Sequence, residues 1–399
     1  MRSLQCQSAY DCLSTARHWR PAIIPFLPYH RQKSPNAPNL SKKAPYSTGF
    51  SRDLQYPSPP YFKSLRQPKY TFQGLPGQTN YSTAATKEPT IHHIFETVTG
   101  TWQYIISDPL TRSAAIVDPV LDYNPVNQAI TTDSADALLS LVQEKGYRVE
   151  IILETHAHAD HLTAASYLQK QLFQTQGFKP PIGIGKRIEQ VQRLFGQRYG
   201  IQSGEYEAVF DKLFEDDESF QIGELTAKAI HLPGHTPDHL GYQIGGMIIH
   251  HHSHSHATNM VTQDNVFCGD SLFHVDIGTA RCDFPGGDAK DLFQSSRKLL
   301  SLDGHVKIWP GHDYPPEGRD SPIPWMSVAD HRKQNKHVGD VVSEKEFVSL
   351  RRERDAKLNA PRLLHQSLQV NIRAGQLPKP LKSGHRMLHL PLKLDGLEW

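Results

Sequence analysis

Cysteine is scarce in this chain: only four of the 399 residues are Cys, at positions 6, 12, 268 and 282. No two of them form a C-x-x-C pair, and their spacing suggests no disulfide framework, so a reducing compartment fits best. Long apolar runs are also missing. The stretch 22–27 is interrupted by Pro25 and is far shorter than the roughly 20 residues that a membrane-spanning helix needs. The sequence therefore predicts a soluble protein without a membrane partner.

Acidic residues are nearly absent from the first part of the chain. Residues 1–87 contain twelve Lys or Arg, and Asp11 and Asp53 are their only acids. Of the whole-chain totals of 43 basic and 41 acidic residues, 31 and 39 therefore lie from residue 88 onward, a net charge near −8. This body of the protein is mildly acidic and is not expected to present a basic face to a nucleic acid.

Proline is frequent in the same N-terminal region. Residues 1–88 hold eleven of the 29 prolines, with many Ser and Thr and no sustained helical or strand period. An acid-poor, Arg- and Ser-bearing N-terminus is typical of a mitochondrial transit peptide. A disordered extension of a cytoplasmic protein has a similar composition and is the alternative, because 88 residues is long for a presequence. In either case we predict that residues 1–88 lie outside the folded core.

Strands and helices are predicted to begin near residue 90. Residues 97–106 (TVTGTWQYII) and 114–118 (AAIVD) are rich in β-branched and aromatic residues, as strands are. Apolar residues recur at i, i+3, i+4 and i+7 within 134–145, which predicts a helix, and Gly146 follows as its C-cap.

A buried strand over 149–153 (VEIIL) follows that helix, and the run THAHADH comes directly after it at 155–161. A second helical pattern covers 162–173. The order strand, helix, strand, loop, helix places THAHADH at the carboxyl edge of a sheet, where the sites of layered α/β proteins gather. Further strands are expected at 220–222, 227–232, 241–244 and 266–268, with a helix at 289–300.

The run THAHADH concentrates metal-ligand chemistry. It contains His156, His158, Asp160 and His161. Three further donors each follow an apolar run: His235 in LPGHTPDH, Asp270 in FCGDSLF and His312 in WPGHDY. Imidazole and carboxylate are ligands for zinc and for iron. Because these nitrogen and oxygen donors all follow predicted strands, we predict that they form a metal site.

These elements resemble the metallo-β-lactamase superfamily, an α/β fold in which an αββα sandwich carries a metal site at one edge of its two sheets. The resemblance predicts a metallo-β-lactamase-like domain over 89–375, with a loop insertion at 247–265 and a C-terminal tail at 376–399. In the two-zinc members, the resemblance implies that His156, His158 and His235 bind one ion and that Asp160, His161 and His312 bind the other, with Asp270 bridging. That arrangement implies a hydrolase of glutathione thioesters, like glyoxalase II.

A second group of motifs is similar to the persulfide dioxygenase and sulfur dioxygenase branch, which is related to glyoxalase II. The motifs are DIGTARCDFPGG at 276–287, GDAKDLFQS, PGHDYPPEGRD, DHRKQNKHV and VNIRAG. Within the branch, the bacterial β-lactamase-hydrolase-like sulfur dioxygenases provide the best likeness. The resemblance implies one Fe(II) per chain, bound by His156, His235 and Asp270, while His158, Asp160, His161 and His312 surround it. Two histidines and one carboxylate are also the ligands of many non-haem Fe(II) oxygenases.

The activity implied by this branch is oxidation of glutathione persulfide by O2 and water to glutathione and sulfite, in sulfide catabolism. Arg281 and Tyr314 fall at positions expected to contact glutathione, and an ion pair of Arg281 with Asp283 or Asp288 is the alternative. No partners other than these small molecules are expected, apart from a second copy of the chain in a homodimer. The run HHHSHSH at 250–256 is interpreted as a solvated loop.

Several polar residues near the donors have predicted supporting roles. Asp118 follows AAIV and either orients a ligand imidazole or caps a turn before Pro119. Asp238 and His239 follow the second donor loop and are expected to hydrogen-bond to substrate or to select the sulfur donor. The charged run RRERD at 351–355 is interpreted as a solvated helix face.

Overall fold

The computed structural model describes residues 88–245, 265–394 and 396. These residues belong to one compact unit of the chain, Asn80–Trp399. The run at 250–256 and nearly all of the predicted N-terminal extension and of the predicted insertion lie outside the described residues. The described part contains two six-stranded sheets and one three-stranded sheet.

The first sheet has the strand order β1-β2-β3-β6-β8-β9. β1, β2 and β3 pair antiparallel, whereas β3, β6, β8 and β9 pair parallel. The predicted strand over 97–106 is wrong in its first part, because residues 97–100 form the turn between β1 and β2 and Gly100 has φ 70°. The strands are β1 (Thr90–Glu96), β2 (Thr101–Ser107), β3 (Ser113–Val117), β6 (Arg148–Leu153), β8 (Ile182–Gly185) and β9 (Lys212–Phe214).

The second sheet has the order β10-β11-β12-β13-β14-β15. β10 to β13 pair antiparallel in chain order, and β13 pairs parallel with β14. β11, β13 and β14 therefore run in the same direction and end at the same edge. The strands predicted between 220 and 268 are confirmed. The strands are β10 (Ser219–Ile222), β11 (Leu225–His231), β12 (Leu240–Gly245), β13 (Asn265–Gly269), β14 (Lys307–Pro310) and β15 (Met326–Ser327).

The two large sheets pack face to face. Along β2, Tyr104 and Ile106 belong to the core between the sheets, together with Tyr242 and Phe267 of the second sheet. Ile105, between them in sequence, belongs to the core on the other face of the first sheet. Because β3 is buried on both faces, its sequence after Ser113 is continuously apolar and does not alternate with polar residues.

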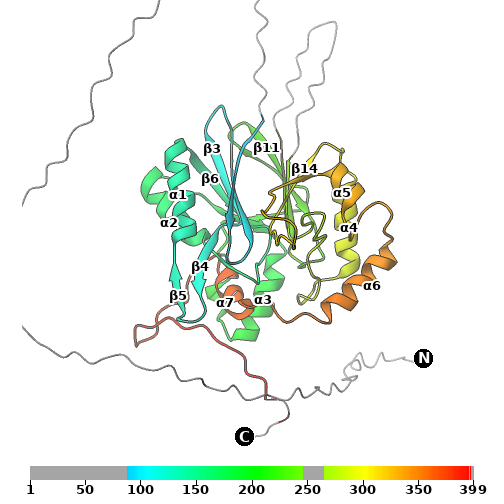
Figure 1. Ribbon diagram of the computed structural model, residues 1–399. Helices are drawn as coiled ribbons and strands as arrows, with labels where there is room; N and C mark the ends of the chain where they lie inside the picture. The colour runs from blue at the N-terminus through cyan, green and yellow to red at the C-terminus, as the bar shows by residue number, and fades with distance from the viewer. Residues whose placement is uncertain (1–87, 246–264, 395, 397–399) are drawn as a thin grey trace, which may run out of the picture. The chain divides into compact units, whose positions relative to one another are not determined.

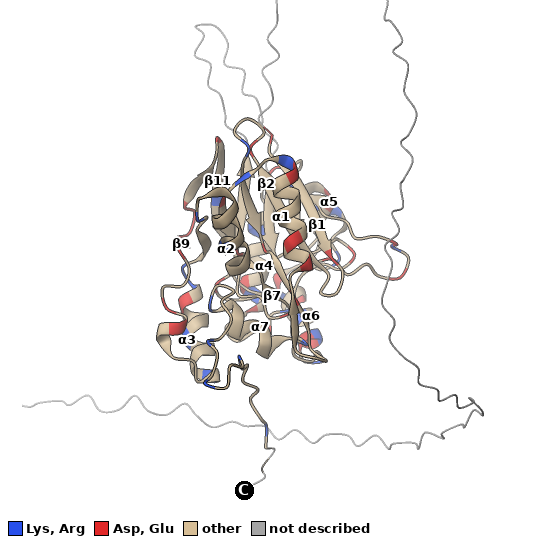
Figure 2. Ribbon diagram, turned by 90° about the vertical axis from the view of Figure 1, so that its left-hand side faces the viewer, with Lys and Arg blue, Asp and Glu red and all other residues tan. Residues whose placement is uncertain are grey.

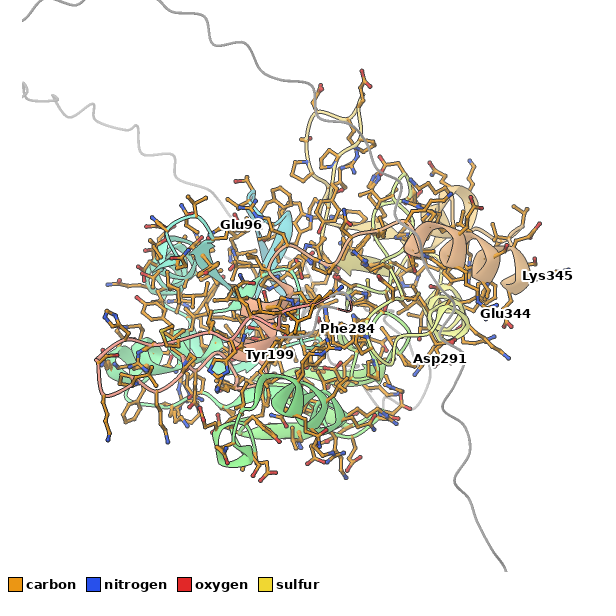
Figure 3. All side chains as sticks on the ribbon, turned by 90° about the horizontal axis from the view of Figure 1, so that it is seen from below. Glu96, Tyr199, Phe284, Asp291, Glu344 and Lys345 are labelled. Carbon is orange, nitrogen blue, oxygen red and sulfur yellow. The ribbon has the colours of Figure 1, made fainter. Side chains whose placement is uncertain are left out.

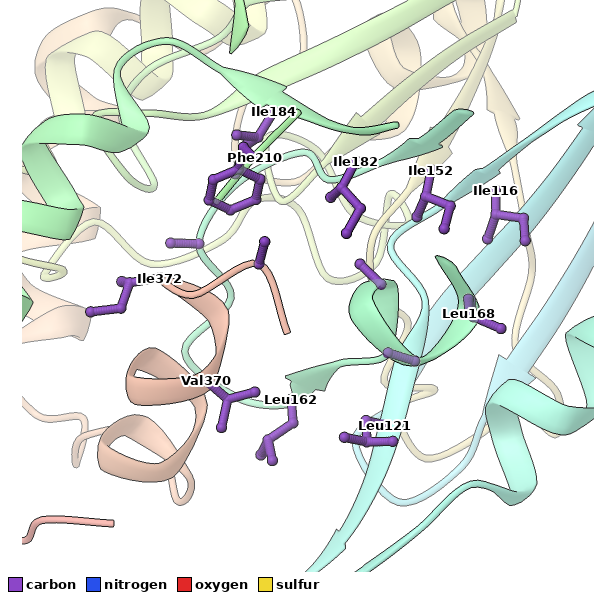
Figure 4. Packing of buried hydrophobic residues seen from close by; sticks show 14 of the residues in the cluster. Ile116, Leu121, Ile152, Leu162, Leu168, Ile182, Ile184, Phe210, Val370 and Ile372 are labelled. Atoms are coloured by element: carbon purple, nitrogen blue, oxygen red, sulfur yellow. The ribbon is translucent and has the colours of Figure 1, made fainter. Parts of the chain in front are cut away.

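Helices cover both outer faces of the paired sheets (Figure 1). The first sheet is covered by α1 (Asp133–Lys145), α2 (Ala165–Gln176), α3 (Ile188–Tyr199) and α7 (Leu364–Asn371), and the second by α4 (Ala289–Leu300), α5 (Val328–Gln334) and α6 (Glu344–Asp355). Figure 4 shows Leu168 of α2 near Ile116 and Ile152 of the first sheet. This layer order confirms the predicted αββα sandwich.

The predicted helices over 134–145 and 289–300 are confirmed as α1 and α4. α2 begins three positions later than the prediction over 162–173. Residues Leu162 and Thr163 form β7 instead, because they pair with Leu121 and Val120 of β4 (Val120–Asn124). β4 also pairs with β5 (Ala129–Thr131), which completes the small third sheet.

The prediction that RRERD is a solvated helix face is wrong for two of its residues. Arg351 and Asp355 lie one turn apart on α6, are both buried and form an ion pair. Asp355 also accepts the backbone N–H of Cys282 at 2.8 Å. α6 therefore anchors the 276–287 segment, which carries the branch-specific motif.

Charged residues of both signs lie on the described surface. Figure 2 shows basic and acidic residues interleaved on the side that carries α1 and α2. Within the described ranges, no helix is both long and apolar enough to cross a membrane.

After α7, residues 376–394 contain neither helix nor strand. Gln369 of α7 forms hydrogen bonds with the backbone N–H and C=O of His389 in this segment.

Candidate metal centre

The seven predicted donors follow the carboxyl ends of four strands, β6, β11, β13 and β14. β11, β13 and β14 end at one edge of their sheet, and His312, two residues after β14, forms an isolated bridge with Thr101 of β2 in the first sheet. The ligand atoms of His156, His235 and Asp270 lie within 4.8 Å of one another, and those of His158, Asp160 and His161 form a second such group. His312 Nε2 lies 3.2 Å from Asp160 Oδ2 and 3.6 Å from Asp270 Oδ1. The structure thus brings all seven donors together.

The donor loops approach one another so closely that two glycines are required. Gly234, just before His235, has φ 132°, and a Cβ there would lie 2.2 Å from the backbone nitrogen of Leu292 in α4. Gly269, just before Asp270, has φ 48°, and its Cβ would lie 2.6 Å from Thr155 Oγ1. A larger residue would push the His235 loop away from α4, or the Asp270 loop away from Thr155.

His156 presents Nε2 to the centre because its other ring nitrogen is held from behind. The Thr155 hydroxyl donates to Asp118 Oδ2 at 2.9 Å, so its oxygen accepts the Nδ1–H of His156 at 3.0 Å. The Thr155 backbone N–H also donates to Asp118, at 2.7 Å. Asp118 therefore holds the ring of His156 through Thr155, which is the contact that its predicted orienting role requires. Burial, followed by the neighbouring His158, holds the pKa of His156 well below its usual range, so this ring is neutral.

His235 and His312 are oriented in the same way by backbone carbonyls. His235 Nδ1–H donates to the carbonyl oxygen of Arg281 at 2.7 Å. His312 Nδ1–H donates to the carbonyl oxygen of Gly100 at 3.2 Å. Fixing the proton on Nδ1 leaves the Nε2 lone pair of each ring available to a metal ion.

His158 has the opposite orientation. Its Nε2 lies 3.1 Å from Asp118 Oδ1 and 3.2 Å from Glu154 Oε2, so Nδ1 is the atom that faces the centre. Although burial opposes the charge, the Asp118 and Glu154 carboxylates hold the pKa of His158 well above its usual range. Burial raises the pKa of Glu154. A cation that bound Nδ1 would have to displace a proton from this ring.

Four atoms at the centre are buried and lack a hydrogen-bond partner among the described residues: His156 Nε2, His158 Nδ1, His161 Nε2 and Asp270 Oδ1. Buried polar atoms without partners cost free energy unless another group satisfies them. Imidazole nitrogens and a carboxylate oxygen aimed at one small region are suitable ligands for a divalent cation. The residues present therefore fit a metal ion.

The guanidinium of Arg281 is already engaged. It forms two bonds with the carboxylate of Asp283 and donates to the carbonyl oxygen of Asn359 at 2.8 Å. The ion pair left open as an alternative is therefore present. Tyr314 is 48% exposed and stacks on His312, with ring centroids 5.6 Å apart and planes 10° apart. The glutathione contacts predicted for Arg281 and Tyr314 stay predictions.

Asp238 and His239 support the donor loops, contrary to the expectation that they contact substrate. Asp238 Oδ2 accepts the backbone N–H of Ala157 at 2.9 Å, and His239 Nε2 accepts that of Asp270 at 2.9 Å. Both side chains are completely buried. Their hydrogen bonds instead hold the loops on either side of the donor group in place.

Two supporting residues, Glu154 and Asn371, were not predicted. Glu154 directly precedes THAHADH and accepts from Thr163 as well as from His158. Asn371 lies at the end of α7 and donates to the carbonyl oxygens of His158 and His161, both at 2.8 Å. The only sequence signal for Asn371 was the motif VNIRAG, which gives no indication of a contact with residues so far away in the sequence.

Comparison with known proteins identifies the family. Residues 97–249 match the Metallo-beta-lactamase superfamily. Glyoxylase B2 of Dictyostelium discoideum is 42% identical over 302 residues, which cover 74% of this chain and 94% of that protein. The chain belongs to the metallo-beta-lactamase superfamily. It is therefore a metal-dependent enzyme of the hydrolase or oxidoreductase type that acts on small molecules.

Other metallo-beta-lactamase superfamily relatives carry names for different chemistry. The mitochondrial persulfide dioxygenase ETHE1 of Homo sapiens is 30% identical over 225 residues, which cover 56% of this chain and 68% of that protein. The crystal structure of ETHE1 from Myxococcus xanthus superposes with a TM-score of 0.53 at 24% identity, covering 72% of this chain and all of that one (100%). This structural likeness supports the fold alone, and the choice of reaction depends on the metal centre.

Proposed function

We propose that this superfamily member is a persulfide dioxygenase that oxidises glutathione persulfide at one Fe(II) bound by His156, His235 and Asp270. The observation that carries the proposal is the grouping of these three ligand atoms within 4.8 Å of one another. Two imidazoles and one carboxylate leave coordination positions open, as the chemistry of non-haem Fe(II) requires. Sequence similarity to a protein named persulfide dioxygenase also supports this proposal.

The proposed reaction balances with the reactants named. Glutathione persulfide, O2 and water give glutathione and sulfite, with release of protons. The sulfur–sulfur bond breaks, the terminal sulfur is oxidised to sulfite, and O2 accepts the electrons. When bound, Fe(II) would supply the redox chemistry. The chain's own residues would hold the reactants close together and keep bulk water away from them.

A pocket of about 530 Å³ reaches the centre at His161 and is the proposed entry for the persulfide. Val98 of the β1–β2 turn and Val126 of the β4–β5 turn lie at its rim and are 80% and 84% exposed. Tyr314 packs against the same β1–β2 turn, through Gly100. The pocket is large enough for a peptide-like molecule.

Arg362 is the charged group of this pocket that is best placed to bind an anion. The two acids in the lining are already used, because Glu96 accepts from Val98 and Thr99, and Asp122 accepts from Ser134. Among the described residues, Arg362 has no hydrogen bond or ion pair. A guanidinium with free donors matches the geometry of a carboxylate. We therefore assign a carboxylate of glutathione to Arg362.

A second candidate function is hydrolysis of glutathione thioesters by two metal ions. The observation that favours it is the second donor group, His158, Asp160 and His161, with His312 close by. The relative at 42% identity is named Glyoxylase B2. In that case a metal-activated water would attack the thioester.

The two candidates are separated by an oxygen electrode and a parallel thioester assay on iron-loaded protein. With glutathione persulfide, we expect O2 uptake and equivalent formation of sulfite. Thioester hydrolysis without any O2 uptake would overturn the dioxygenase proposal. Arg362→Ala should raise the KM for the persulfide, and Arg362→Lys should restore part of the affinity because it keeps the charge but not the fork.

We also propose that the protein is mitochondrial. Two observations support this location: the acid-poor, Arg-bearing composition of residues 1–87 and the word mitochondrial in the name of the human relative. Expression of the full chain with a C-terminal fluorescent tag tests the proposal. Cytosolic fluorescence, together with an uncleaved N-terminus, would contradict it.

A further inference from the structure

One peptide group lies between a candidate metal ligand and a buried carboxylate. It joins Arg281 to Cys282. Its carbonyl oxygen accepts the Nδ1–H of His235 at 2.7 Å, and its N–H donates to Asp355 Oδ2 at 2.8 Å. We propose that Asp355 is a positioning residue for His235 and acts through this peptide group. The inference rests on the part of the proposed function that makes His235 a metal ligand.

The two hydrogen bonds of this peptide group strengthen each other. A carboxylate at the N–H shifts electron density toward the carbonyl oxygen, which then accepts more strongly from the imidazole. The bond from His235 is 2.7 Å long, whereas the equivalent bond from His312 to the carbonyl oxygen of Gly100 is 3.2 Å. The shorter bond is the one with a charged group behind its acceptor, as expected for charge-assisted hydrogen bonding. A strong bond at Nδ1 fixes the ring and makes Nε2 a better electron donor to a metal ion.

The carboxylate of Asp355 acts at short range and with little screening. His235, Cys282 and Asp355 are each 8% exposed, so little water surrounds them. Arg351 donates to Asp355 Oδ1, which lowers the cost of burying the charge and leaves Oδ2 to the N–H of Cys282. The ion pair therefore allows a buried carboxylate without removing its bond to the peptide group.

The 276–287 segment has other contacts that fix it, so a carboxylate is not needed for that purpose alone. The N–H of Thr279 donates at 3.1 Å to Nδ1 of His337, which is neutral because burial lowers its pKa to about 3. α6 comes from the edge of the molecule, where Figure 3 labels Glu344, and Phe284 of the segment lies nearer the middle. The last residue of this helix places the carboxylate at the peptide group that contacts the candidate ligand. This placement points to a role in the metal centre.

Asp355→Asn tests the inference, because it keeps the shape of the side chain and an oxygen that can accept from Cys282 but removes the charge. We expect it to weaken Fe(II) binding about tenfold, the lower end of the loss that follows removal of a group that orients a ligand. Arg351→Gln is the matched control. It breaks the same ion pair, while its amide, one helical turn away, can still donate to the carboxylate. Its iron affinity should stay close to that of the wild type.

Titration of the full-length variants with Fe(II) under anaerobic conditions measures these affinities. Equal losses in Asp355→Asn and Arg351→Gln would mean that the ion pair only stabilises the fold, and would overturn the inference. The double variant replaces the ion pair with a neutral hydrogen-bonded pair, and it provides the same test if Asp355→Asn alone fails to fold. It should bind iron as weakly as we expect for Asp355→Asn, and wild-type affinity in the double variant would also overturn the inference.

Nuclear magnetic resonance follows the hydrogen bond of His235 directly and needs no turnover. The Nδ1 proton of this ring is observed in full-length protein with labelled histidine and bound zinc, which is diamagnetic, and is identified by its absence in His235→Ala. Asp355→Asn should move the resonance upfield because the hydrogen bond weakens, and Arg351→Gln should leave it in place. An unmoved resonance in Asp355→Asn would overturn the inference. If His235→Ala binds iron as the wild type does, the proposed ligand set fails as well; if only Asp355→Asn keeps wild-type affinity, the role of Asp355 alone is rejected.

Discussion

The side-chain amide of Asn371 donates to the carbonyl oxygen of His161 at 2.8 Å, across 210 positions of the sequence. Asn371 also donates to the carbonyl oxygen of His158, and its own side-chain oxygen accepts the backbone N–H of Thr163. The last turn of α7 therefore holds the loop that carries four of the seven candidate donors.

Replacing Asn371 with Ala should weaken both the fold and the metal site. The change leaves buried backbone groups without partners, at a cost of about 2–4 kcal/mol in the free energy of unfolding. It should also lower the affinity for iron, because the loop is no longer fixed. Gln369→Ala on the same helix removes contacts with His365 and His389 but none with the THAHADH loop, and it is the matched control. Denaturant unfolding and iron titration check both expectations, and equal iron affinities in the two variants would contradict the role of Asn371.

Metal content distinguishes the triad from a two-metal centre. We expect His235→Ala to empty the site, because it removes one of the three proposed ligands. Asp160→Ala and His312→Ala should each retain one iron per chain. Elemental analysis of the purified variants provides the measurement. If His312→Ala lost half of two bound metal ions, the dinuclear hydrolase would be favoured instead.

The carboxylates behind His156 and His158 give a second test of the ligand set. Asp118 supports His156 through Thr155, whereas Glu154 contacts His158 but not His156. Loss of a group that orients a ligand typically costs about 10–100-fold in metal affinity. If iron is bound by the triad alone, Asp118→Asn should show that loss and Glu154→Gln should not. Isothermal titration with Fe(II) under anaerobic conditions measures both affinities, and similar losses in both variants would indicate that His158 is a ligand.

The stability of the protein should fall in mild acid because of His331, which is not one of the seven donors. Burial lowers the pKa of His331 from 6.5 to about 4, and its Nδ1 accepts from Asn335, as a neutral ring can. Below pH 6.5 the unfolded chain takes up a proton that the folded chain refuses. The free energy of unfolding should therefore decrease between pH 6.5 and pH 4, by about 3 kcal/mol from this residue.

The variant His331→Gln isolates this contribution. It should be less stable than the wild type at pH 7, yet lose less stability between pH 7 and pH 4. Urea unfolding at several pH values measures the difference between the two proteins. Comparing the two removes the contribution of other buried histidines, such as His337, whose pKa burial lowers to about 3. Parallel pH profiles for both proteins would show that His331 is not responsible.

The candidate centre was predictable from the sequence because its donors follow strands that run in one direction. The apolar runs before His156, His235 and Asp270 identified those strands, and the carboxyl ends of such strands meet at one edge. The αββα order followed from the resemblance and from the alternation of strands and helices. Neither conclusion required knowledge of which side chains touch.

Contacts between distant segments could not be predicted in the same way. The pattern RRERD has the composition of a solvated face, but Arg351 and Asp355 are buried because they pair with each other and anchor Cys282. Pro-Gly is a common turn sequence, whereas the need for Gly234 before His235 comes from the backbone of Leu292 packed against it. Such requirements depend on tertiary packing, which cannot be read from amino-acid composition or from the periodicity of apolar residues.

The contact between α7 and the THAHADH loop also determines when the centre can be completed. During synthesis the loop leaves the ribosome long before Asn371, which is 210 positions further along the chain than His161. Closing so long a connection is a slow step compared with forming local helices and hairpins. Metal loading in the final geometry is therefore expected to be a late event of biogenesis, and truncation before α7 should yield a chain that has every ligand but retains metal poorly.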